Sequence, residues 1–275
     1  MTNPVIVYLA DKRDRFDPCG WYRYDCLCAS LKTVKLFLPP LPIVIFHEDF
    51  KDSDRELIHS IIPNVTFEQI DFSGHEQYHV NNRPDGRCGA YGYCMMCRFY
   101  CGVMQSHPLI ARHTHYMRLD DDNYFVAPTP PKFIGGALKR DYTYSCNYSE
   151  PHRTCYEFTA NFLRRHNRKV PKYSVNVPYN NMHISSLRLW NHPLVKEYLE
   201  AVEEVHGYVA LGWQDAVIHS MILRGLAPSA KLDVYQDRNI YYRHNQQCVH
   251  LGTHTPYCRD GKNDRFPWGP PICLS

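Results

Sequence analysis

The sequence lacks any long hydrophobic run and any marked excess of charge. No stretch of eighteen apolar residues occurs in its 275 residues, so it predicts no membrane-spanning helix. The formal net charge is +3, and basic and acidic residues are interleaved along the chain. Because a nucleic-acid-binding protein usually concentrates basic residues on one face, this pattern argues against nucleic acid as a partner.

The first residues lack the features of a secretory signal peptide. The segment MTNPVIVYLADKRD has no basic start, no long apolar centre and no cleavage site, and it becomes charged at Asp11. We therefore expect a cytoplasmic protein, in which the 12 cysteines are free thiols rather than disulfides. Cys94 and Cys97 have the spacing of half a zinc site, but no second pair at a usual spacing accompanies them, which favours buried thiols.

The first seventy residues alternate between predicted strands and helices. Apolar, β-branched runs at 5–10, 42–46 and 65–70 predict strands, and the segments 21–32 and 52–62 between them predict helices. This order predicts an α/β fold with a mostly parallel sheet flanked by helices. Asp11 follows the first strand, where open α/β sheets bind nucleotides, so it is a candidate base or ribose contact; a solvated turn is the alternative.

The remainder of the chain contains further helical patterns and no repeat or linker. We expect helices at 93–106, despite Gly102, at 152–167, at 193–205 with Asn191 as its cap, and at 213–223. Residues 73–92 are predicted to form a loop, and the last 50 residues to be irregular and extended. The sequence therefore predicts one domain over 1–275.

Three consecutive carboxylates, Asp120, Asp121 and Asp122, end the apolar run that begins at Tyr116. Carboxylates packed this closely repel each other unless a cation lies among them. A strand that delivers Asp-x-Asp at its end can hold a divalent cation whose open positions bind nucleotide phosphates, as in glycosyltransferases. A solvated acidic turn is the alternative, but the aromatic and apolar residues on both sides favour a site.

Several segments resemble one family. They are YCMMCRF at 93–99, HPL at 107–109, YMRLD at 116–120, NNMHI at 180–184, WQDAVIHS at 213–220 and IYYRH at 240–244, followed by Cys248. In this order they are similar to blocks of the fungal α-1,2-mannosyltransferases, glycosyltransferase family 15. The resemblance covers roughly residues 91–248, and it leaves room for a virus-encoded relative.

The resemblance implies a GT-A fold, GDP-mannose as the donor, Mn²⁺ as the cofactor with Mg²⁺ as an alternative, and a glycan or glycoprotein acceptor. Asp120 falls on the family's metal-binding glutamate, and His244 falls on a histidine that would complete the coordination started by Asp120 and Asp122. The half 1–126 would bind the nucleotide sugar, and the half 127–275 would shape the acceptor side. The family's Golgi location makes the Golgi lumen the alternative if the chain is truncated.

Tyr93, Arg98 and Arg118 are further candidates for donor binding. The two arginines could each give a bidentate contact to the diphosphate, or could pair with a carboxylate of the core.

Two candidate catalytic residues, His183 and Asp215, bear on the stereochemistry. His183 stands where the family has a glutamate proposed as nucleophile, and an imidazole cannot replace that carboxylate. We therefore expect His183 to contact the sugar or the acceptor, in a reaction that retains configuration. Asp215 lies in the first turn of the predicted helix at 213–223, and it is the candidate base for an inverting alternative.

Other functions remain open from the sequence. A donor of the UDP-sugar type would leave the glycosyltransferase interpretation intact. A non-catalytic sugar-binding or nucleotide-binding module with the same fold is an alternative of another class. A metal-dependent phosphohydrolase would need further ligands near the three aspartates, and none is seen there.

Overall fold

The computed structural model describes residues 3–10, 22–80, 90–125, 127–130, 132–227, 229–230, 232–234, 241–244 and 247–250. The candidate nucleotide contact Asp11 lies outside these residues. No helix within the described ranges is both long enough and apolar enough to cross a membrane. The seven cysteines that the structure describes with their side chains are free thiols, as expected.

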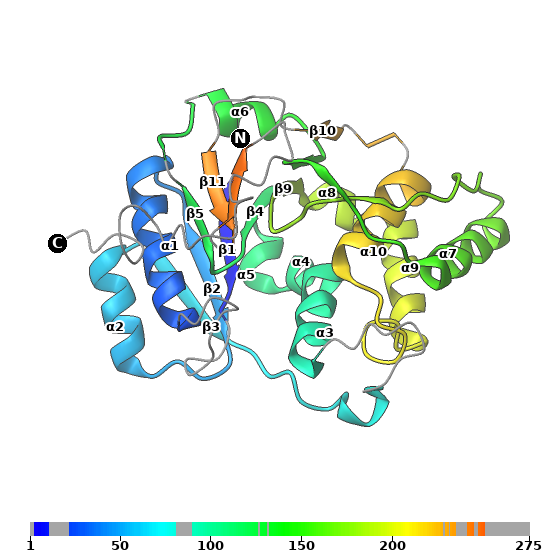
Figure 1. Ribbon diagram of the computed structural model, residues 1–275, viewed down its shortest axis with the longest axis horizontal. Coiled ribbons are helices and arrows are strands. Elements are labelled where there is room, and N and C mark those ends of the chain that lie inside the picture. The colour runs from blue at the N-terminus through cyan, green and yellow to red at the C-terminus, as the bar shows by residue number, and fades with distance from the viewer. Residues whose placement is uncertain are drawn as a thin grey trace, which may run out of the picture.

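A seven-stranded sheet runs through the centre of the molecule (Figure 1). Its strand order is β10-β6-β9-β4-β1-β2-β3, and within this sheet β9 is the one described strand that runs antiparallel to its neighbours. The mostly parallel sheet that the sequence predicts is thus confirmed. The strands are β1 (Pro4–Leu9), β2 (Ile43–His47), β3 (Val65–Gln69), β4 (His115–Leu119), β6 (Tyr142–Tyr144), β9 (Met182–Ser186) and β10 (Leu232–Val234).

Helices cover both faces of this sheet, because its central strands are apolar on both sides. In β1, Val5 and Val7 belong to one core cluster, whereas Ile6 and Tyr8 belong to the other. In Figure 1, α1 and α2 lie on one side of the sheet and α7, α9 and α10 on the other. The helices on the first side are α1 (Arg23–Phe37), α2 (Asp52–Ile61) and α6 (Lys132–Ala137). Those on the second are α3 (Tyr91–Arg98), α4 (Met104–Ser106), α5 (Pro108–Ala111), α7 (Arg153–Arg165), α8 (Leu187–Trp190), α9 (Pro193–Glu204) and α10 (Asp215–Met221).

The helix expected at 93–106 is interrupted, which corrects that prediction. Between α3 and α4, Cys101 and Gly102 leave the helical conformation, and Gly102 has a φ of 111°. Glycine adopts this left-handed conformation readily because it has no Cβ. The side chain of Gln105 accepts a hydrogen bond from the Gly102 amide at 2.7 Å and stabilises the break.

The structure also corrects two details of the predicted helices and loops. The cap of α9 is His192 rather than Asn191, with Pro193 in the first turn. The predicted loop 73–92 contains a short 3-10 helix, η1 (Glu76–Tyr78), and ends where α3 begins at Tyr91.

The C-terminal part also contains strands, whereas the sequence predicted irregular structure. β11 (Tyr241–His244) pairs antiparallel with β12 (Gln247–His250) and with β5 (Asn123–Phe125), in a separate three-stranded sheet. A further pair is formed by β7 (Asn147–Ser149) and β8 (Asn176–Pro178). The pairing of β11 with β5 places His244 directly opposite Asn123, and it therefore brings the histidine to the aspartate turn. The division into halves at 126 and 127 stays a prediction.

Candidate functional site

The three aspartates occupy a tight turn between β4 and β5. The Asp120 amide donates to the carbonyl of Asn181 at 3.1 Å, and the Asn123 amide closes the turn onto the Asp120 carbonyl at 3.0 Å. The side chains of Asn123 and Asn181 are buried and joined by a hydrogen bond of 3.1 Å. These bonds fix the turn at the end of β4, so the carboxylates are held in defined positions.

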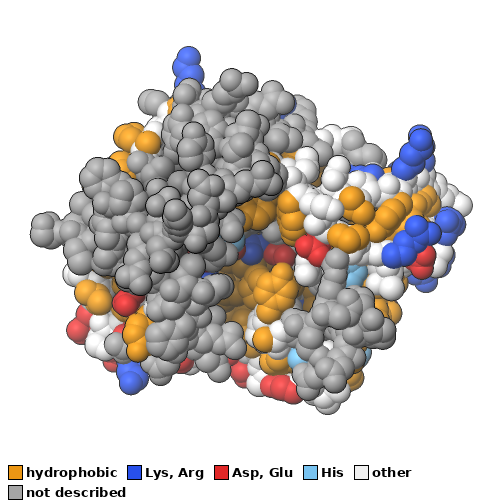
Figure 2. Space-filling model, viewed as in Figure 1, with side chains coloured by type: hydrophobic (Ala, Val, Ile, Leu, Met, Phe, Trp, Pro, Cys, Tyr) orange, Lys and Arg blue, Asp and Glu red, His pale blue; other side chains and the backbone are white. Residues whose placement is uncertain are grey.

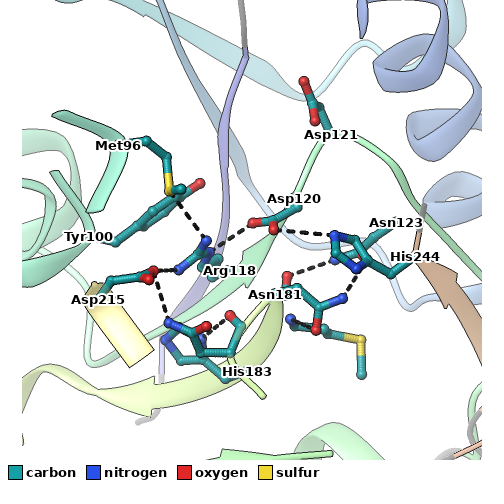
Figure 3. A network of polar contacts seen from close by, with 12 residues as sticks. Met96, Tyr100, Arg118, Asp120, Asp121, Asn123, Asn181, His183, Asp215 and His244 are labelled. Atoms are coloured by element: carbon teal, nitrogen blue, oxygen red, sulfur yellow. Dashed lines mark hydrogen bonds and ion pairs between the residues drawn. The ribbon is translucent and has the colours of Figure 1, made fainter. Parts of the chain in front are cut away.

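Asp120, Asp122 and His244 converge on one point. Figure 3 shows two of them, Asp120 and His244, facing each other. One ligand atom from each lies within 4.8 Å of the others. Nε2 of His244 is 3.3 Å from Oδ1 of Asp122 and 3.6 Å from Oδ2 of Asp120. On the other side of the ring, Nδ1 shares a hydrogen bond of 2.7 Å with the Tyr179 hydroxyl, which orients Nε2 towards the carboxylates. Three predicted metal ligands are therefore adjacent.

Arg23, in the first turn of α1, neutralises the other side of this turn. Its guanidinium forms ion pairs of 2.5 Å with Asp121 and 2.8 Å with Asp122. Burial alone would raise the pKa of Asp122, but the nearby His244 and Arg23 lower that pKa to about 2. The pKa of Asp120 is raised by burial, which the charges of Arg118 and His244 only partly offset. Asp122 is therefore the more strongly ionised of the two candidate ligands.

Arg118 lies beneath the turn, buried between two carboxylates. Its guanidinium donates to Asp120 at 2.8 Å and to Asp215, and it lies over the ring of Tyr100 at 3.6 Å from the centroid. A contact of 3.6 Å with the Met96 sulfur completes its surroundings (Figure 3). Of the two roles that the sequence left open for Arg118, the contacts seen here are those of pairing with core carboxylates.

Asp215 lies in the first turn of α10, as predicted, although that helix begins at Asp215 rather than at Trp213, and the carboxylate of Asp215 is fully engaged. It accepts hydrogen bonds from Arg118 and, at 2.9 Å, from the side chain of Asn180, while the Cys97 thiol lies 3.7 Å away. Burial by itself would raise its pKa, but Arg118 above all, with His219 and Asn180, holds the pKa of Asp215 below its ordinary value. A carboxylate in this environment is a weak proton acceptor.

His183, on β9, is completely buried. Its Nδ1 is 2.8 Å from the Asn180 carbonyl and its Nε2 is 3.1 Å from the Tyr116 hydroxyl, and its ring stacks on Tyr142. Burial, with the positive charges nearby, keeps the pKa of His183 well below its usual range, so the ring is neutral. Because the His183 ring has no exposed surface, it cannot make the contact with a sugar or acceptor that the sequence led us to expect.

A pocket of about 590 Å³ opens at the carboxyl ends of the parallel strands. Its wall includes Leu9 and Ala10 at the end of β1, Glu48 after β2 and Asp71 after β3, together with Arg23. Figure 2 shows this face of the molecule hollowed near its centre, where apolar side chains surround a few basic and acidic groups. The position is that of nucleotide sites in open α/β sheets, and the size suits a small-molecule ligand.

The two remaining sequence candidates lie in different surroundings. Tyr93 lines the pocket, next to Tyr91 and Met96. Arg98 forms an ion pair of 2.9 Å with Glu203, which lies on α9. Sequence reasoning did not single out Arg23 or the pair of Asn123 and Asn181. The asparagines stand in segments that were noted, but nothing in the sequence indicates which of their side chains would meet.

Two solved structures of other proteins have a similar fold. The structure superposes on the mannosyltransferase Ktr4p from S. cerevisiae with a TM-score of 0.70, at 19% identity, over 90% of this chain and 71% of that one. It superposes on core-mannan synthase A from Aspergillus fumigatus, in its Mn/GDP form, with a TM-score of 0.71, at 16% identity, over 94% and 80%. The fold is that of the GT-A glycosyltransferases, in a single domain.

Sequence matches point to the same family as the resemblance noted in the sequence. The family model described as glycolipid 2-alpha-mannosyltransferase matches residues 139–275. The glycolipid 2-alpha-mannosyltransferase of Saccharomyces cerevisiae is 24% identical over 177 residues, 57% of this chain and 39% of that protein. The O-glycoside alpha-1,2-mannosyltransferase omh1 of Schizosaccharomyces pombe is 18% identical over 232 residues, 74% and 60%. The resemblance to glycosyltransferase family 15 is confirmed. The chain spans 39% of the length of the S. cerevisiae relative and 60% of the length of omh1.

Proposed function

We propose that this protein is a metal-dependent glycosyltransferase that moves mannose from GDP-mannose onto a hydroxyl of a glycan or glycoprotein, with retained configuration. The observation that carries the proposal is the cluster of Asp120, Asp122 and His244 beside a pocket at the carboxyl edge of the sheet. The similarity to family 15 mannosyltransferases, one of them described in an Mn/GDP form, supports mannose and GDP as the donor components. The half 1–126 supplies most of the pocket, and 127–275 borders the acceptor side.

The residues of the cluster suit a divalent transition metal. A ligand set of two carboxylates and one imidazole suits Mn²⁺ better than a set of oxygen ligands alone does. Mg²⁺ is the second choice. Oδ1 of Asp122 is buried and lies 3.3 Å from Nε2 of His244, so it faces the cluster. Asp121 is held by Arg23 and is not part of the ligand set. A metal held there would neutralise charge that develops on the departing diphosphate.

Retention is favoured by the surroundings of Asp215. An inverting reaction needs a base that accepts the proton of the attacking hydroxyl. Asp215 is tied to Arg118 and Asn180, and its pKa is lowered, so it is poorly suited to that task. We therefore assign attack from the face that the diphosphate leaves, with a phosphate oxygen accepting the proton. In this scheme Asp215 fixes Arg118, and His183 positions Tyr116 from within the core.

Thermal unfolding in the presence of nucleotides tests the donor and the metal together. A ligand at 100 times its Kd stabilises the native state by about 2.7 kcal/mol, which corresponds to roughly 5–11 °C for a domain of this size. We expect GDP with Mn²⁺ to produce such a shift, and UDP with Mn²⁺ or GDP with EDTA to produce much less. Asp122→Asn should abolish the Mn²⁺-dependent part of the shift.

The matched control is Asp52→Asn, which removes a carboxylate whose side chain is 93% exposed on α2. It should leave the shift unchanged. A larger shift with UDP would replace GDP-mannose by a UDP-sugar donor. Binding of GDP that is equal with Mn²⁺ and with EDTA would contradict the metal site and would favour a non-catalytic nucleotide-binding module.

A further inference from the structure

The pocket has an electrostatic property that the proposed function does not account for. Among its described lining residues, Arg23 is the one basic side chain, whereas Glu48, Asp71 and Glu76 contribute carboxylates. A nucleoside diphosphate carries negative charge, so an acidic wall repels it unless cations are placed beside its phosphates. Among the lining residues that the structure describes, Arg23 is therefore the side chain that can attract such a ligand.

Arg23 is also tied to the metal cluster. The NH1 group donates to Oδ2 of Asp122 at 2.8 Å, and the NH2 group contacts Oδ1 of Asp121 at 2.5 Å. Its side chain is 20% exposed, so it borders both the turn and the pocket. A guanidinium has five N–H donors, and these two contacts leave others for a further acceptor. One side chain thus reaches a candidate metal ligand and the candidate diphosphate site.

A guanidinium and a divalent cation beside the same carboxylate oppose each other. Both are positive, and Asp122 is a partner of Arg23 as well as a member of the cluster with Asp120 and His244. Like charges within a few ångströms cost free energy, so Arg23 weakens a cation at this position. A diphosphate placed beside both cations offsets that repulsion, because it is attracted to each.

We propose that Arg23 couples the two ligands: it competes with the divalent cation for Asp122 in the absence of nucleotide, and it donates to the diphosphate when both are bound. The proposal rests on the proposed function, since it takes a nucleoside diphosphate as the ligand of the pocket. Metal alone then binds weakly, and metal together with nucleotide binds strongly. Arg23 is in this sense a positioning residue that makes binding of the two cooperative.

The test measures two affinities for wild type and for Arg23→Gln. Mn²⁺ affinity without nucleotide is measured by titration calorimetry or by the electron paramagnetic resonance signal of free Mn²⁺. GDP affinity is measured at saturating Mn²⁺. We expect Arg23→Gln to bind Mn²⁺ on the order of tenfold more tightly, because a competing charge is gone. We expect it to bind GDP roughly 10- to 100-fold more weakly, because a charge-assisted contact is lost.

Two further variants separate this role from a structural one. Arg23→Lys keeps the charge but loses the planar fork, so Mn²⁺ affinity should stay near the wild-type value and GDP affinity should be partly restored. The control Arg188→Gln removes another arginine from an ion pair, with Asp141 at 2.6 Å, outside the site. It should change neither affinity.

Opposite changes in the two affinities support the proposal. A parallel loss of both affinities in Arg23→Gln would overturn it, because that is the result of a damaged site, and so would unchanged values for both. If Arg23→Gln does not fold, Arg23→Met removes the same charge and supplies the same comparison. Wild-type protein that binds Mn²⁺ but no nucleoside diphosphate would overturn the donor assignment and the diphosphate contact, whereas the competition for Asp122 is still decided by the Mn²⁺ titration.

Discussion

Replacing Arg118 by methionine should leave one buried carboxylate, Asp215, and one half-buried carboxylate, Asp120, without their arginine partner. Arg118 is 2% exposed, and its guanidinium pairs with both Asp120 and Asp215, so Arg118→Met removes the counter-ion of each. Breaking a buried ion pair from one side typically costs about 3–5 kcal/mol. At roughly 2–4 °C per kcal/mol for a large domain, the melting temperature should fall by on the order of 10 °C.

The loss of stability in Arg118→Met should depend on pH, and the direction of that dependence follows from the pKa of Asp215. The folded-state pKa of Asp215 is lowered, so its stabilisation is present above the unfolded pKa of about 3.9 and is lost as the pH falls below it. In Arg118→Met the stranded carboxylates favour the protonated form. The deficit in stability against wild type should therefore be largest near neutral pH and should shrink as the pH falls towards 4.

Urea unfolding followed by tryptophan fluorescence measures both effects, since Trp190 and Trp213 are buried. The double variant Arg118→Met with Asp215→Asn removes one stranded charge, and it should recover part of the loss. A deficit below about 1 kcal/mol at pH 7, or one that grows as the pH falls, would refute the account of Arg118 as a buried counter-ion.

Three other predictions concern neighbouring residues. Burial lowers the pKa of His219 to about 4, so protonation of the unfolded chain should reduce stability as the pH falls from about 6.5 to 4, and His219→Gln should flatten that part of the stability curve. A Cβ at Gly207 would lie 2.5 Å from the Trp213 ring, so urea unfolding of Gly207→Ala should show a loss of about 1–3 kcal/mol, whereas Gly135→Ala, with open space around it, should stay within about 0.5 kcal/mol. Asp215→Asn should lower turnover, and the anomeric proton coupling of its product, read by NMR, should remain that of an α-linkage; a β-linked wild-type product would make Asp215 the base of an inverting reaction.

The fold could be predicted from local patterns because its strands are continuous apolar runs. The runs that became β1, β2 and β3 are buried or half-buried strands separated by helices, and that order favours a parallel sheet. The break at Gly102 could not be predicted, because glycine also occurs inside helices. Strand β11 lies in a polar segment, and its pairing with β5 is a contact between distant parts of the chain.

Some residues of the site could likewise be predicted from the sequence, whereas the contacts between them could not. Asp120 and Asp122 stand in a recognisable motif, and His244 was found by resemblance alone. Arg23 is separated from Asp122 by 99 positions along the chain, and no local pattern indicates that contact. Arg118 was noted from its position, but its pairing with Asp215 spans 97 positions. Which charges neutralise one another is therefore information that comes from the tertiary structure.

The most direct test of the central claim is transfer from GDP-mannose to a mannoside acceptor, with the product analysed by NMR. We expect an α-linked product that forms with Mn²⁺, fails to form in EDTA, and is lost in Asp122→Asn but kept in Asp52→Asn. Equal product formation in EDTA, or in Asp122→Asn, would contradict the assignment of Asp120, Asp122 and His244 as the metal site of a glycosyltransferase.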